Sequence, residues 1–277
     1  KVVMRLLKKT GGVPTLVELG LRGKALQNPQ DNIARPHGII LITGPTGSGK
    51  TTTLYSVLSR LNSNKVNIVT LEDPIEYQIA GVNQVQIHPQ AGLTFASGLR
   101  SFLRQDPNII MVGEIRDAET ADLAVQESLT GHLVFSTLHT NNAAGALPRL
   151  LDMHAEPYLI ASTVTCVVGQ RVVRTICVNC KTPKTLSQEV LATLRKMLGN
   201  LYDFDKKLPT LYVGKGCGEC NTTGYVGRVG IYEVLPVSEK VSRLILARET
   251  TQKMEEAAIS EGMITMKQDG YLKVLEG

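Results

Sequence analysis

The sequence contains no tryptophan, and aromatic residues make up only 4% of its 277 positions. Proteins that hold single-stranded nucleic acid usually stack its bases on aromatic side chains, so stacking platforms of this kind are sparse here. The net charge of +5 is modest. A small positive charge permits contact with an acidic surface but does not require it. We therefore expect no direct nucleic-acid ligand.

Long apolar runs are also scarce. The most apolar stretch, residues 159–173, is interrupted by Gln170 and Arg171, and it is too short and too polar to span a bilayer. The first residues read as a strand and not as a signal peptide. These features favour a cytoplasmic protein. Since the sequence does not begin with methionine, we expect further segments before residue 1.

The clearest motif lies at residues 44–51, directly after the apolar run 39–42. It reads, in order, Gly44, Pro45, Thr46, Gly47, Ser48, Gly49, Lys50 and Thr51, and Thr52 completes the predicted nucleotide-binding set. This pattern is that of a phosphate-binding loop between a strand and a helix. Its backbone N–H groups surround phosphate oxygens, Lys50 reaches the outer phosphates and the Thr51 hydroxyl binds Mg²⁺. We therefore predict that the chain binds ATP or ADP with Mg²⁺.

Apolar strand-like runs alternate with helix-like stretches from residue 38 to about residue 174. Such alternation is typical of an α/β fold whose parallel sheet is covered by helices on both faces. The expected strands are residues 39–43, 67–71, 109–112 and 133–137. The expected helices are residues 51–62, 95–104 and 118–129.

Hydrolysis needs carboxylates that hold the metal or activate water. Glu114 follows the predicted strand 109–112 at its carboxyl end, where ligands bind in open α/β sheets. We assign Glu114 to water activation or indirect metal binding. Among the carboxylates that follow residue 71, we expect Glu72 and Glu76 to organise metal and water, and Asp73 to cap or solvate a turn.

Two histidines flank the predicted strand 133–137. His139 follows the strand and is a candidate contact for the γ-phosphate. His132 precedes the strand and should lie toward its opposite end. A lone histidine is more often structural than catalytic, and spacing alone does not decide between these roles.

Four of the five cysteines form two pairs, each separated by two residues. The pairs are Cys177 with Cys180 and Cys217 with Cys220. Two such knuckles suit tetrahedral Zn²⁺ in a structural site. The long interval between the pairs predicts an insertion that loops out, and disulfides are the rival interpretation. Cys166, in an apolar helix-like run, is expected to be a buried small residue.

The phosphate loop, the acidic residues 72–76, the segment 113–117 and the histidine segment 131–140 occur in this order. In this combination the chain resembles the type II secretion and type IV pilus assembly ATPases over almost its whole length. The resemblance implies an α/β fold: a RecA-like parallel-sheet ATPase core, a small tetracysteine zinc module and a helical C-terminal region. The implied segments are 1–37 (the end of an N-terminal domain and a linker), 38–176 (the core), 177–237 (the zinc module) and 238–277 (the helices).

The resemblance also implies roles for individual residues. It makes Glu114 the catalytic carboxylate and His132 and His139 members of a histidine box. The arginines that stabilise phosphate charge look like Arg5 and Arg100, with Arg104 a weaker candidate.

The resemblance further implies partners and a location. The expected protein is a homo-hexamer with ATP or ADP, Mg²⁺ and Zn²⁺. It would act in the cytoplasm, peripheral to the inner face of the cell membrane, on an inner-membrane platform protein. The tetracysteine module favours assembly or secretion over pilus retraction. The alternatives are a retraction ATPase, a nucleic-acid-translocating RecA-like ATPase, and a nucleotide-gated scaffold that hydrolyses little ATP.

Overall fold

The structure is a computed structural model, and it describes residues 12–206 and 209–277. The strand expected near the start of the chain lies outside these residues. In the described part, nine strands form two sheets. They are β1 (Gly38–Thr43), β2 (Ile68–Glu72), β3 (Asn83–Gln86), β4 (Ile109–Val112), β5 (Leu133–Leu138), β6 (Val164–Ile176), β7 (Lys181–Lys184), β8 (Leu211–Gly214) and β9 (Tyr225–Pro236).

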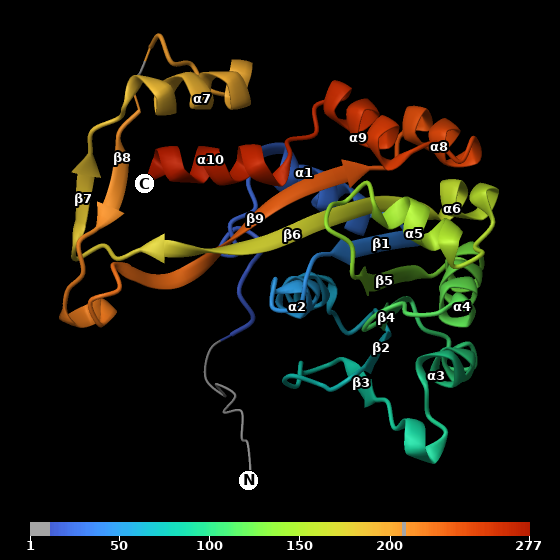
Figure 1. The fold of residues 1–277 in the computed structure, drawn as a ribbon. Helices are drawn as coiled ribbons and strands as arrows, with labels where there is room; N and C mark the ends of the chain where they lie inside the picture. The colour runs from blue at the N-terminus through green and yellow to red at the C-terminus, as the bar shows by residue number, and fades with distance from the viewer. Residues whose placement is uncertain (1–11, 207–208) are drawn as a thin grey trace.

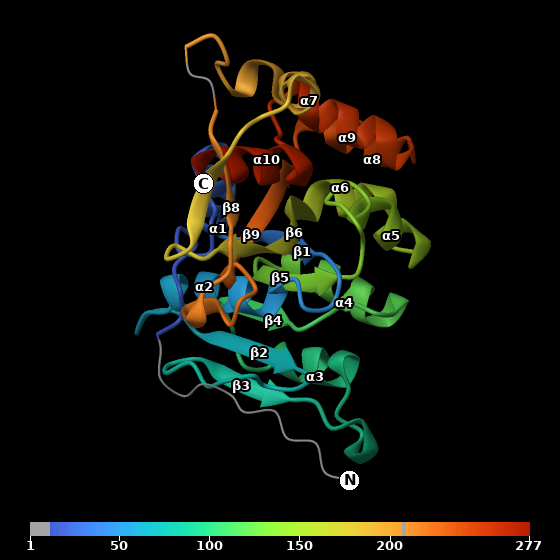
Figure 2. The same cartoon turned by 60° about the vertical axis from the view of Figure 1, so that its left-hand side comes forward.

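The large sheet has the strand order β3-β2-β4-β5-β1-β6-β9. Figure 2 shows β3 and β2 at the lower end of this sheet and β6 and β9 at its upper end. All neighbouring strands are parallel except β6 and β9, which run antiparallel. Strands β1, β2, β4 and β5 are buried along their whole length, as expected of parallel strands covered on both faces.

Helices connect these strands and cover the sheet. In the described part they are α1 (Gly23–Ile33), α2 (Lys50–Leu61), α3 (Phe95–Phe102), α4 (Ala118–Leu129), α5 (Ala146–Asp152), α6 (Pro157–Thr163), α7 (Gln188–Leu198), α8 (Glu239–Leu246), α9 (Thr251–Ser260) and α10 (Met266–Glu276), with short 3-10 turns at Pro89–Ala91, Gly199–Leu201 and Gly218–Cys220.

Alternate residues of β1 divide the core between the two faces of the sheet. Ile39 and Leu41 pack with α4, α5, α6, α8 and α9, whereas Ile40 and Ile42 pack with α1 and α2. This division follows from the two-residue period of a strand. The phosphate-loop helix α2 is thereby fixed against the sheet through Leu54, Tyr55 and Leu58.

Local sequence explains several element ends. Helix α4 begins where the Asp117 side chain accepts a hydrogen bond from the Thr120 N–H at 2.8 Å, and such a cap satisfies a helix end. The helix ends before Gly131, whose φ of +103° suits glycine. The bounds of α4 and β4 match the predicted helix 118–129 and strand 109–112, and the other predicted core strands and helices are confirmed with one or both ends shifted by one or two residues.

The long strands β6 and β9 carry the sheet beyond the core. Figure 1 shows them running together toward the small antiparallel sheet β7–β8, with α7 beside it and α10 against β9. The boundary expected near residue 176 therefore falls on a sheet that continues across it, because β9 lies within the segment 177–237.

One local expectation was wrong. Cys166 lies in strand β6 and not in a helix-like run, because consecutive valines suit a strand that pairs on both sides. The N-terminal linker contains the helix α1, whose Ile33 is buried against the sheet. Cys166 is nevertheless fully buried, as expected. Within the described residues, the helices are all too short or too polar to cross a membrane.

Candidate functional site

The phosphate loop connects β1 with α2 at the carboxyl edge of the sheet. Gly49 caps α2 with a φ of +88°, a conformation that glycine adopts without strain. Because the first N–H groups of a helix have no partner within the helix, they point out of its start and favour an anion there. The loop therefore has the backbone of an anion site.

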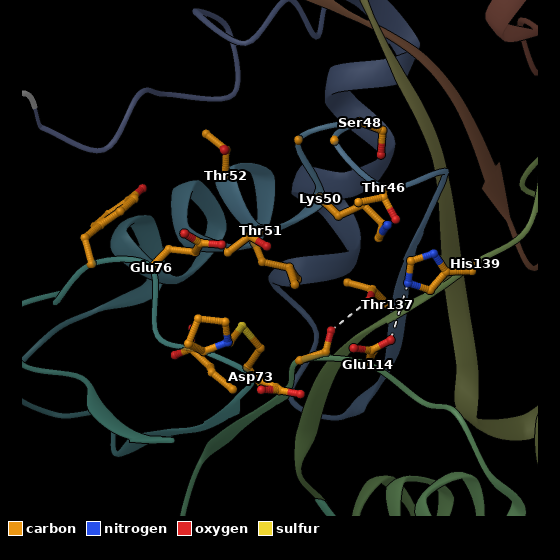
Figure 3. A pocket seen from close by; sticks show the side chains of 18 of the residues that line it. Thr46, Ser48, Lys50, Thr51, Thr52, Asp73, Glu76, Glu114, Thr137 and His139 are labelled. Carbon is orange, nitrogen blue, oxygen red and sulfur yellow. Dashed lines mark hydrogen bonds and ion pairs between the residues drawn. The ribbon is translucent and has the colours of Figure 1, made fainter. Parts of the chain in front are cut away.

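Lys50 begins α2 and its side chain lies over the loop. Its ammonium group donates hydrogen bonds to the carbonyl oxygens of Gly44 at 2.8 Å and Pro45 at 3.2 Å. Partial burial lowers the pKa of Lys50, and the nearby Glu114 carboxylate opposes this shift. A lysine cation facing Glu114 across the cavity can bind phosphate oxygens (Figure 3).

Glu114 follows β4, and its carboxylate lies between the side chains of Arg116 and His139. Its Oε1 lies 2.5 Å from Arg116 Nη2 and its Oε2 lies 3.3 Å from His139 Nε2. Burial acts to raise the pKa of Glu114, but Arg116 and His139 outweigh it and the net shift is downward. The group is thus a carboxylate at neutral pH and can accept a proton or orient water.

Strand β5 positions this carboxylate through its backbone. The Ile115 N–H donates to the Thr137 carbonyl at 3.0 Å, and the Thr137 hydroxyl donates to the Gly113 carbonyl at 2.7 Å (Figure 3). His139 comes from the same strand end. Two neighbouring strands therefore bring Glu114 and His139 together.

Glu72, at the end of β2, is only 1% exposed and is committed to hydrogen bonds. It accepts from the Tyr55 hydroxyl, from the Thr70 hydroxyl at 2.6 Å and from Gln84 Nε2 at 3.0 Å. These three donors leave little capacity for a metal or water. The structure places Glu72 beneath the acidic segment, where it fixes α2 and β3 relative to each other.

Asp73 and Glu76 follow Glu72 in a loop and line the cavity with Thr51. Figure 3 shows the Glu76 and Thr51 side chains facing the same space. Oxygen donors of this kind suit Mg²⁺, which prefers carboxylate, hydroxyl and water ligands. The donor set therefore fits the magnesium ion that accompanies a nucleoside triphosphate.

These groups surround a cavity of about 760 Å³. It brings together the predicted loop residues 46–52 with Glu72, Glu76, Glu114 and His139. Four predicted residues are not among the described residues that line it: Gly44 and Pro45 of the loop, Arg100 and His132. Arg100 pairs with Glu119 on the surface of α3 and α4. His132 lies at the opposite end of β5, with Nδ1 2.9 Å from the Glu127 carbonyl oxygen. Arg5 lies outside the described residues.

Several lining residues were not predicted. Arg228, from β9, reaches the cavity although it is separated from the loop by more than half of the chain. Asp73, which we expected only to cap or solvate a turn, also lines it. Gln170, on β6, donates a hydrogen bond to the phosphate loop at the Ser48 carbonyl oxygen. Strand pairing over such distances leaves no local signal, although the polar Gln170 inside an apolar run was a visible irregularity.

The four paired cysteines converge at the far end of β6 and β9. Their sulfurs all lie within 4.8 Å of one another, with neighbouring separations of 3.8, 3.9 and 3.7 Å. Four thiolates about 2.3 Å from one tetrahedral Zn²⁺ would be separated by about 3.8 Å. Backbone N–H groups of Cys217 and Gly224 point at the Cys220 sulfur. The cluster is a possible metal site whose donor set and spacing fit zinc.

The fold and the cavity define a class of protein. A mostly parallel sheet, a phosphate loop between β1 and α2, and a carboxylate after β4 are the parts of a RecA-like nucleotide-binding ATPase core.

The chain belongs to the family of type II/IV secretion system proteins, whose model matches residues 1–277. It is 51% identical over 278 residues to the type II secretion system ATPase E of Vibrio cholerae, covering 100% of this chain and 54% of the relative. It is 47% identical over 277 residues to the type IV pilus assembly ATPase PilB of Thermus thermophilus, covering 100% of this chain and 31% of the relative. The chain thus spans about half or less of these relatives.

Solved structures agree with this assignment. The ATPase DotB of Legionella pneumophila matches with a TM-score of 0.66 and 26% identity, covering 95% of this chain and 62% of that one. The pilus retraction motor PilT with bound ADP matches with a TM-score of 0.63 and 28% identity, covering 96% and 68%.

Proposed function

We propose that this chain binds and hydrolyses ATP, and that the longer protein uses this hydrolysis to drive assembly of a type IV pilus or a type II secretion pseudopilus. The observation that carries the proposal is the single cavity in which Lys50 and Thr51 face Glu114. Related proteins are named as secretion and pilus assembly ATPases, which supports assembly as the process that hydrolysis drives.

Each side chain has a role in this proposal. The loop N–H groups and Lys50 bind the phosphates. Glu114 orients the attacking water and accepts its proton, and His139 keeps that carboxylate aimed. A bound Mg²⁺ would neutralise charge on the phosphates, and Thr51, Asp73 and Glu76 would hold it directly or through water.

We further propose that the longer protein is a homo-hexamer in the cytoplasm, at the inner face of the membrane, acting on an inner-membrane platform protein. Cys177, Cys180, Cys217 and Cys220 would bind one structural Zn²⁺. The arginines Arg5 and Arg100 and the histidine His132 remain proposed contributors. Arg100 and His132 lie away from this cavity, so such roles require another site or another subunit.

ATP turnover and fibre assembly test the proposal together. In the longer protein, Lys50→Ala should abolish ATP turnover, and cells that carry this variant should assemble no fibre. Lys65→Ala is the matched control, because Lys65 is exposed beyond the end of α2. Full turnover by Lys50→Ala would refute the nucleotide chemistry.

The alternatives predict other results. If the unaltered protein turned over ATP, and cells carrying Lys50→Ala assembled fibres normally but failed to withdraw them, the protein would be a retraction motor. Stimulation by single-stranded DNA, with salt-sensitive binding, would indicate a nucleic-acid motor. Binding without turnover in the intact protein would indicate a scaffold.

A further inference from the structure

We propose that Gln170 is a positioning residue that holds the phosphate loop in its binding conformation, an inference that rests on the proposed binding of nucleotide by this loop. Gln170 lies in β6 and is 2% exposed. Its Nε2 donates to the Ser48 carbonyl oxygen at 2.7 Å, and its Oε1 accepts from the Thr53 hydroxyl at 2.8 Å. One side chain therefore joins the loop to the first turn of α2.

The orientation of the Gln170 amide follows from its partners. The Ser48 carbonyl oxygen is an acceptor only, so it must face the amide NH₂, and the amide oxygen must then face Thr53. Both of these polar ends are buried, and each would lose a hydrogen bond in any apolar replacement. The amide is thus fixed at both ends.

Holding the Ser48 carbonyl also directs an N–H group. In a trans peptide the carbonyl and the following N–H point in opposite directions. Because the Ser48 carbonyl points toward Gln170 in the sheet, the Gly49 N–H of the same peptide points away from Gln170. Ser48 and Gly49 both line the cavity. Gln170 therefore sets the direction of an N–H donor that the phosphates need.

The loop also rests on Gln170 sterically. A Cβ on Gly49 would lie 2.9 Å from Gln170 Nε2, and a Cβ on Gly44 would lie 2.3 Å from the Gln170 carbonyl oxygen. Both contacts are closer than real Cβ atoms allow. The glycines at the two ends of the loop thus permit its approach to Gln170, as well as its backbone turns.

Equilibrium binding of a fluorescent ADP derivative to the full chain tests this inference. Gln170→Leu removes both hydrogen bonds at nearly the same volume. We expect Gln170→Leu to raise the Kd for ADP about tenfold or more. Thr53→Val removes the hydrogen bond to the amide oxygen of Gln170 and should raise the Kd about threefold. The double variant should bind about as weakly as Gln170→Leu, because both changes act through one amide. In ATP turnover, KM should rise more than kcat falls, since Glu114 is untouched.

Thr165→Val is the matched control. Thr165 is another buried polar residue of β6, and its hydroxyl donates to the Ile39 carbonyl at 3.3 Å, away from the loop. It should lower the melting temperature without changing the Kd for ADP. An unchanged Kd in folded Gln170→Leu, or an equal loss of affinity in Thr165→Val, would overturn the inference.

Thr53→Val decides the matter if Gln170→Leu does not fold: a wild-type Kd in Thr53→Val then overturns it. Failure of the unaltered protein to bind ADP would instead refute the proposed function.

Discussion

The charge of Glu114 depends on neighbours from two different elements. Arg116 follows it in the same loop and His139 approaches from the end of β5. Burial would raise the pKa of Glu114, yet these two side chains lower it below its ordinary value. A base must be ionised to accept a proton, and this lowering keeps Glu114 ionised to a lower pH than an ordinary carboxyl group.

Removing Arg116 should therefore change the pH dependence of ATP turnover. In Arg116→Ala the pKa of Glu114 rises, so the base is lost at a higher pH and the acid limb of the kcat/KM profile moves upward. The measurement is ATP turnover between pH 4.5 and 8. Arg60→Ala, which changes an exposed arginine at the end of α2, should leave the limb in place. An unmoved limb in Arg116→Ala would show that Glu114 does not titrate in the reaction.

Glu72 lines the cavity, but its carboxylate is engaged by three hydrogen-bond donors. The pKa of Tyr55 is raised by burial and by its hydrogen bond to Glu72, which marks a neutral hydroxyl that donates to a carboxylate. Tyr55 also accepts from the Glu76 N–H at 3.3 Å. The pair thus supports the loop that carries Asp73 and Glu76.

Tyr55→Phe should accordingly lower the free energy of unfolding by about 1–3 kcal/mol, because a buried charged acceptor loses its donor. ATP turnover should also fall as the acidic loop loosens. Tyr158→Phe, at a tyrosine that is 61% exposed, should change stability by less than about 0.5 kcal/mol. Denaturant unfolding of the two variants gives the comparison, and equal stability would contradict the structural role of Tyr55.

Among the elements, the cysteine knuckles join the ends of β6 and β9 to the small sheet β7–β8. Cys177 follows β6 directly and Cys220 lies shortly before β9. The Cys177 N–H donates to the Gly224 carbonyl at 3.0 Å. A metal at this point would tie the two long strands to β7 and β8.

Zinc should be present at about one ion per chain in gently purified protein. Cys217→Ser should lose that zinc and lower the melting temperature, because three thiolates remain where four are needed. Cys166→Ala should keep the zinc, since Cys166 is buried inside β6 away from the cluster. Metal analysis of the three proteins decides the point. A zinc content near zero in the unaltered protein would refute the site.

Local elements of the core were predictable because their signals are local. The phosphate loop, α4, and Glu114 after β4 follow from motifs and from periodicity. The pairing of β9 with β6, the approach of Arg228 to the cavity and the contact of Gln170 with Ser48 did not. Each depends on residues far apart in the sequence, and a strand pattern names no partner strand.

For the molecule as a whole, β6 and β9 connect the nucleotide cavity with the cysteine knuckles and with the C-terminal helices. On β6, Gln170 holds the phosphate loop. On β9, Glu233 accepts hydrogen bonds from the Ala143 N–H at 2.6 Å and the Met266 N–H at 3.1 Å. Ala143 lies just beyond His139, and Met266 begins α10. Rigid strands of this kind provide a physical connection between the cavity and the helices.

In the proposed function, one cavity both binds ATP and hydrolyses it, with separate residues for each step. Parallel measurement of ATP affinity and of turnover in Glu114→Gln and Lys50→Ala separates the two steps. We predict that Glu114→Gln binds ATP as tightly as the unaltered protein while its turnover falls by about 10²–10⁴-fold, and that Lys50→Ala loses binding. Unchanged turnover in Glu114→Gln would refute the proposed role of Glu114.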